Sequence, residues 1–158
     1  MTKFILISIF AVILSACGED KQTGAVDTKW DRDVCERCMM MLSDRNFSAQ
    51  VRVFPAGKRS KVYKFDDLGC AVLWLNKVEK QAVYRDNPKT EIWVNDYKSK
   101  EWIDAEKAWY IKDEISPMGY GLGAQLDKAD GALNYEQAVE HIYVVEEKLN
   151  IHGGNLDH

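Results

Sequence analysis

The order of predicted strands and helices limits this chain to a small mixed domain. Residues 49–54 alternate apolar and polar side chains, a turn follows at 55–58, and residues 61–65 are predicted as the returning strand of a hairpin. Asp66 or Asp67 can then cap a helix. The apolar positions of this helix are Leu68, Ala71, Val72, Leu75 and Val78. The first part of the chain is therefore strand, strand, helix.

The second half repeats this order with longer connections. Strands are predicted over residues 91–95 and 101–104, and a further apolar segment covers 108–111. The last helix begins after Asn134, with Gln137 placed to complete a capping box. Its apolar stripe is Ala138, Ile142, Val145 and Leu149. Two such units in 158 residues predict one α/β domain of the α+β kind.

Residues 35–41, which we call the sulfur cluster, contain two cysteines and three of the five methionines of the chain. Thiolates and thioethers favour Cu(I) over hard cations because the ion and its sulfur ligands are both polarizable. Methionine also fills cores, but three consecutive methionines cannot all face one core from a helix or a strand. We interpret the sulfur cluster as metal-binding, with packing as the alternative.

Other soft or nitrogen ligands are scattered along the chain. Met118 stands in a loop interrupted by proline and glycines, where a soft ligand brought beside Cys38 and Met40 explains it better than gap filling. Cys70 follows a glycine in the first turn of a predicted helix, and a buried apolar role is favoured over a third ligand or a redox partner. That glycine, Gly69, destabilises the helix unless another group packs closely against it. His141 is interpreted as an edge histidine rather than a ligand.

The first residues predict export. A charged start and apolar residues 4–14 precede Leu14-Ser15-Ala16-Cys17, which is similar to a bacterial lipobox. The apolar run is shorter than the roughly 20 residues of a membrane span. We expect residues 1–16 to be removed and Cys17 to carry lipid, facing the periplasm. Gly18 favours the outer membrane of a Gram-negative cell.

The remaining chain divides into a predicted flexible tether over residues 17–29, a domain over 30–150 and a mobile tail over 151–158. The formal net charge of −4 and the lack of a basic patch argue against a nucleic-acid partner. After export, the thiols that remain are odd in number, which argues against a simple disulfide framework. They are Cys35, Cys38 and Cys70.

Five motifs occur in order along the chain. They are Cys35-x-x-Cys38-Met39-Met40, Phe65-Asp66-Asp67-Leu68-Gly69-Cys70, Trp93-Val94-x-Asp96-Tyr97, Trp102-Ile103-Asp104-Ala105 and Pro117-Met118-Gly119-Tyr120-Gly121. Together they resemble the NosL family, the copper-binding lipoproteins that accompany nitrous oxide reductase, over essentially the whole mature chain.

This resemblance implies a periplasmic chaperone, not an enzyme, that delivers Cu(I) for the tetranuclear copper-sulfide site of nitrous oxide reductase. The implied partners are the reductase, its assembly machinery and, through Cys17, the membrane; whether the chain forms a homodimer is open. The implied fold has two ββα-type units, similar in topology to organomercurial lyase.

The resemblance also implies a ligand set. The family's Cys-x-Met pair falls on Cys38 and Met40, and its loop methionine falls on Met118. Cys35 is a fourth ligand or a bystander. Many relatives have glycine where this chain has Met39, which loses backbone freedom and adds a competing ligand. One anchoring thiolate with neutral thioethers would allow the copper to leave.

Three alternatives compete with the copper chaperone. A thiol-disulfide oxidoreductase could use Cys35 and Cys38, but the motif precedes the first predicted strand and its methionines would have no purpose. A structural zinc site lacks a second ligand pair, and no hydrolase signature is present. Arg37 next to Cys38 would lower the pKa of that thiol if it points toward it.

Overall fold

The structure is a computed structural model that describes residues 22–149, apart from the side chains of residues 78–81 and 149. The predicted signal peptide, Cys17 and the predicted tail over 151–158 lie outside the described residues. Within residues 22–149 no helix combines the length and the apolar character needed to cross a bilayer.

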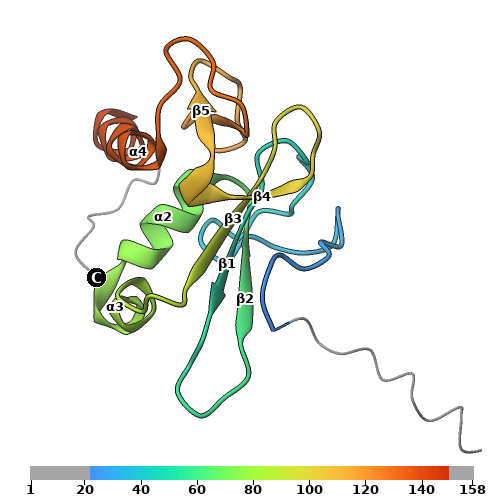
Figure 1. Cartoon of the computed structure of the whole chain (residues 1–158), viewed down its shortest axis with the longest axis vertical. Coiled ribbons are helices and arrows are strands. Elements are labelled where there is room, and N and C mark those ends of the chain that lie inside the picture. The colour runs from blue at the N-terminus through green and yellow to red at the C-terminus, as the bar shows by residue number, and fades with distance from the viewer. Residues whose placement is uncertain (1–21, 150–158) are drawn as a thin grey trace, which may run out of the picture.

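A four-stranded antiparallel sheet lies at the centre of the domain (Figure 1). Its strand order is β2-β1-β3-β4, and Val51 in the middle of β1 pairs with Tyr63 on one side and Ile92 on the other. Every residue of β1 is buried. The predicted hairpin is confirmed, with its first strand one residue shorter than expected. The strands are β1 (Ala49–Val53), β2 (Lys61–Phe65), β3 (Glu91–Asn95) and β4 (Trp102–Asp104).

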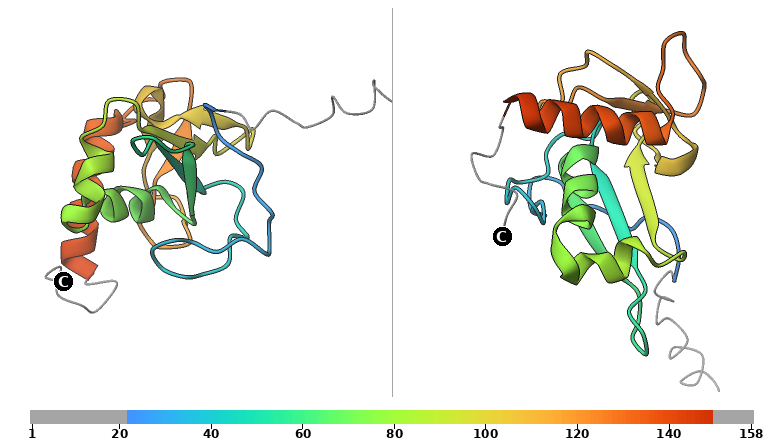
Figure 2. Two further views of the ribbon diagram at one scale, coloured as in Figure 1. Left: turned by 90° about the horizontal axis from the view of Figure 1, so that it is seen from below. Right: turned by 90° about the vertical axis from the view of Figure 1, so that its left-hand side faces the viewer.

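Three helices gather on one side of this sheet (Figure 2). Helix α2 packs against β1 and β2, and α4 packs against α2. Asp67 is the residue that caps α2, because its side chain accepts a hydrogen bond from the backbone N–H of Gly69 at 2.9 Å. The helix pattern predicted through Val78 is broken at Lys77, where the backbone is extended. The helices are α2 (Leu68–Asn76), α3 (Val78–Arg85) and α4 (Tyr135–Leu149).

A second, two-stranded sheet contacts both the last helix, through β5, and the central sheet, through β6. The 3-10 helix η2 (Ala105–Lys107) leads into β5 (Trp109–Ile111), which pairs with β6 (Gly123–Gln125). The apolar segment over 108–111 is thus a strand, whereas β6 gave no sequence pattern because it is short and begins at a glycine. The mixed α/β class and the strand-strand-helix order are confirmed.

The capping box at the start of α4 is confirmed as well. Gln137 donates its backbone N–H to the Asn134 side chain at 2.9 Å, and the Asn134 N–H donates to the Gln137 side chain at 3.0 Å. Ala138 and Ile142 of the predicted stripe are fully buried.

The second face of the sheet is covered by the segment before the sulfur cluster. Gly24 donates its N–H to Glu91 at 2.7 Å, and Val26 exchanges two hydrogen bonds with the Gln50 side chain. Arg52, only 2% exposed, donates to the Gly24 carbonyl. The prediction of a flexible tether through residue 29 is therefore wrong for residues 24–28. The polar side chains Gln50 and Arg52 of β1 therefore hydrogen bond to this backbone segment rather than face water.

Candidate metal centre

Three cysteines converge at the edge of the core. The Sγ atoms of Cys35, Cys38 and Cys70 all lie within 4.8 Å of one another, and all three thiols are free. Cys35 and Cys70 are fully buried, whereas Cys38 is half-buried. We call these residues the cysteine cluster. Three sulfur donors at this separation form a ligand set for a soft metal ion.

A tight loop presents two of these sulfurs. The Cys35 N–H donates to the Met40 carbonyl at 2.8 Å and the Met39 N–H donates to the Cys35 carbonyl at 3.1 Å. This closure brings the Cys38 N–H to 3.5 Å from the Cys35 sulfur. Glu36 donates its N–H to the Lys64 carbonyl, which fixes the loop to the edge of β2. These hydrogen bonds therefore hold the Cys35 and Cys38 sulfurs next to each other.

The third sulfur comes from the first turn of α2, next to a close contact. A Cβ atom added at Gly69 would lie 2.2 Å from Cδ2 of the Tyr120 ring. The prediction that this glycine needs a closely packed neighbour is confirmed. The same contact places the loop that carries Met118 and Tyr120 against the turn that carries Cys70.

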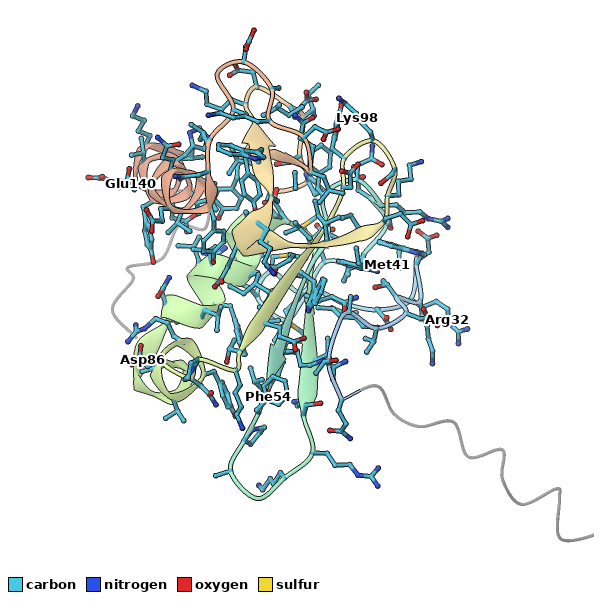
Figure 3. All side chains as sticks on the ribbon, viewed as in Figure 1. Arg32, Met41, Phe54, Asp86, Lys98 and Glu140 are labelled. Atoms are coloured by element: carbon cyan, nitrogen blue, oxygen red, sulfur yellow. The ribbon has the colours of Figure 1, made fainter. Side chains whose placement is uncertain are left out.

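The methionines divide into exposed and buried positions. Met39, Met40 and Met41 are 72%, 49% and 53% exposed, which excludes core packing for these three methionines. Figure 3 shows Met41, at the end of the sulfur cluster, on the side of the domain away from α4. Met118 is buried in the same core as Cys35, and its N–H lies beside the Asp67 carboxylate. Ligation by Met40 or Met118 stays a prediction.

Hydrogen bonding within the cysteine cluster concentrates negative charge on one sulfur. The pKa of Cys35 is lowered because the side chains of Cys38 and Cys70 donate hydrogen bonds to it. The pKa of Cys38 is raised, first by its hydrogen bond to Cys35. Hydrogen bonds to both neighbours, together with burial, raise the pKa of Cys70. A bound cation would allow further thiols to ionise.

Arg37 points inward from the cysteine loop. Its Nη2 atom lies 2.7 Å from Glu146 Oε1, and its Nη1 atom lies 3.4 Å from the Tyr120 hydroxyl. The guanidinium also hydrogen bonds to the Cys70 side chain. The sequence left the direction of Arg37 open; the structure places its charge against Cys70.

His141 is held by the Tyr120 backbone. Its Nε2 atom lies 2.9 Å from the Tyr120 carbonyl oxygen, which can only accept, so this nitrogen donates. The side chain is half-buried, next to the buried Ile142 of the apolar stripe of α4, and is not part of the cysteine cluster. The interpretation of His141 as an edge histidine is confirmed.

The sequence analysis did not identify two buried carboxylates next to the cysteine cluster. Asp66 and Asp67 are 2% and 1% exposed. Burial raises the pKa of each to about 6. Their place immediately before a helix indicated only a cap, because their burial depends on residues far along the chain, such as Ser116 and Met118 beside Asp67.

The fold and the cysteine cluster together define a small mixed α/β domain with a thiol-rich candidate metal centre. The chain belongs to the NosL family, whose model matches residues 28–149. It is also similar to the crystal structure of the copper chaperone NosL from Shewanella denitrificans, with 18% sequence identity and a TM-score of 0.47. That similarity covers 77% of this chain and 88% of the other. No curated protein matches the chain.

Proposed function

We propose that this protein is a Cu(I)-binding metallochaperone and not an enzyme. The observation that carries the proposal is the convergence of three cysteine sulfurs within 4.8 Å of one another. Membership of the NosL family supports it. Thiolates bind Cu(I) strongly, and a trigonal set of sulfur donors needs no further ligand to satisfy this ion.

In this proposal Cys38 is the anchoring ligand and the point of exchange. It is the only partly accessible member of the cysteine cluster, whereas Cys35 and Cys70 hold the ion from inside. Met40 and Met118 act as neutral thioether ligands that replace a thiolate during exchange. A ligand from the recipient forms its bond to copper as one of these bonds breaks, so copper stays in the Cu(I) state.

The recipient we propose is nitrous oxide reductase with its copper-site assembly machinery. Lipid on Cys17 would hold the protein on a membrane facing the periplasm, and Gly18 favours the outer membrane. These proposals rest on the lipobox-like start and on the motifs shared with the NosL family.

The decisive experiment is an anaerobic Cu(I) titration of the reduced chain in competition with a chromophoric Cu(I) chelator. We expect one tightly bound copper, lost in Cys38→Ser and weakened in Cys35→Ser and Cys70→Ser. Met40→Leu and Met118→Leu test the thioethers separately. If the unmodified chain does not compete with the chelator, the proposal fails. The reduction potential of Cys35 and Cys38 would then test the oxidoreductase alternative.

A further inference from the structure

Two methionines of the sulfur cluster have no role in the proposed copper site. Met39 and Met41 flank Met40, and their side chains are 72% and 53% exposed. Met39 also has a φ of 61°, in the left-handed region that glycine adopts without strain. A long apolar side chain is therefore held in solvent at a position whose backbone favours glycine.

These two thioethers can reach one ion. The Cα atoms of residues two apart are separated by at most about 7 Å, and methionine has an unbranched side chain with three rotatable bonds. The hydrogen bond from Cys35 to the Met40 carbonyl holds the loop between them in place. Both sulfurs are thus available to the same surface position.

That position lies on the approach to the cysteine cluster. Cys35 and Cys70 are fully buried, so an ion from solvent meets the half-buried Cys38 first. Cys38 precedes Met39 directly, and the Met40 N–H hydrogen bonds to the Cys38 sulfur. Soft donors therefore stand next to the accessible thiol.

We propose that Met39 and Met41 form a second Cu(I) site on the surface, weaker than the cysteine cluster, which passes its ion to Cys38. The inference rests on the proposed function for the destination of the ion. In the transfer, a bond between copper and the Cys38 sulfur forms as a bond to a thioether breaks. The thiol proton goes to solvent, and copper remains Cu(I). Thioethers are neutral and do not compensate the positive charge of Cu(I), so the surface site binds the ion more weakly than the cysteine cluster does.

The test uses the reduced full-length chain in detergent micelles, labelled with ¹³C at the methionine methyl groups. Ag(I), a soft ion of the same charge, is added and followed by NMR and by ultraviolet thiolate absorption. We expect the first equivalent to change the thiolate absorption. The second equivalent should shift the methyl signals of Met39 and Met41. The double variant Met39→Leu, Met41→Leu should lose the second equivalent and keep the first.

A matched control places one thioether elsewhere on the surface. Leu126 is 61% exposed, and Leu126→Met adds a single methionine without a partner. If its methyl signal shifts at the same Ag(I) concentration as those of Met39 and Met41, or if neither of those two shifts, the surface site is refuted. Methyl shifts without any thiolate response would overturn the proposed function and the transfer to Cys38 but retain ion binding by Met39 and Met41, so the two failures are distinguishable.

Discussion

The Nη2 atom of Arg37 lies 2.7 Å from Oε1 of Glu146, and this ion pair joins the cysteine loop to the last helix of the domain. The two side chains are only 13% and 9% exposed. The Tyr120 hydroxyl donates to the other Glu146 oxygen at 2.6 Å. Removing one partner of a buried pair leaves the other charge without compensation. The geometry of the cysteine loop therefore depends on α4.

Glu146→Gln should lower the free energy of unfolding by about 3 kcal/mol, because the buried Arg37 charge loses its counter-ion. Urea denaturation of the reduced, metal-free chain measures this difference. The matched control is Glu147→Gln, on the exposed side of the same helix. It should change stability by less than about 0.5 kcal/mol. Equal effects of the two substitutions would contradict the assigned role of the ion pair.

Gly69→Ala should destabilise the domain by about 2 kcal/mol, because the new methyl group would overlap the Tyr120 ring. The same substitution made in a Tyr120→Leu background should be less harmful, since the ring is gone. A double-mutant cycle from denaturation curves gives the coupling between the two positions. A coupling near zero would show that the clash is relieved in another way.

Asp67 should make the domain less stable as the pH rises. Its folded pKa of about 6 lies above the ordinary value of 3.8, so the folded state binds the proton more tightly. Stability is then highest below the ordinary pKa, and about 3 kcal/mol is lost as the pH rises through the folded pKa. Asp67→Asn keeps a side-chain acceptor for the cap and carries no charge.

The measurement for Asp67 compares unfolding free energies of the wild type and the Asn variant from pH 4 to pH 7. The decline with pH should be smaller in the variant. Asp66 titrates in both proteins, and the Asp67 charge helps to raise its pKa, so the difference between the two curves measures Asp67 together with its effect on Asp66. Parallel curves would mean that the pKa of Asp67 does not differ between the folded and the unfolded protein, which would contradict the prediction.

Met39→Gly should stabilise the domain by about 1 kcal/mol, because glycine adopts the positive φ without a Cβ clash. Thermal or urea denaturation of the metal-free chain tests this. Met41→Leu removes a thioether without changing the backbone preference and should leave stability unchanged. A destabilised Met39→Gly protein would mean that the methionine side chain makes a contact that outweighs the strain.

Elements defined by neighbouring residues could be predicted from the sequence. The hairpin of β1 and β2 follows from alternation around a turn, and the start of α4 follows from Asn134 and Gln137. The cap of α2 was narrowed to two aspartates, of which the structure selects Asp67. In each case the information lies within a few residues of the chain.

Features that depend on distant contacts were missed or ranked too low. Cys70 was interpreted first as a buried apolar residue, and only the packing of α2 against the cysteine loop brings its sulfur to Cys35. The inward direction of Arg37 depends on Glu146, which lies 109 residues further along the chain. Residues 24–28 are polar and aperiodic, so nothing local showed that β1 would bind them.

The cysteine cluster takes two sulfurs from one loop and the third from a helix beyond the first hairpin. An unfolded chain can offer the nearby pair, but not all three donors in one place. A soft ion that prefers the complete set therefore binds the folded state preferentially, and at 100 times its dissociation constant such a ligand adds about 2.7 kcal/mol of stability. Chains with bound metal would therefore resist proteolysis longer than empty chains, and the lifetime of the protein would depend on whether it carries the metal.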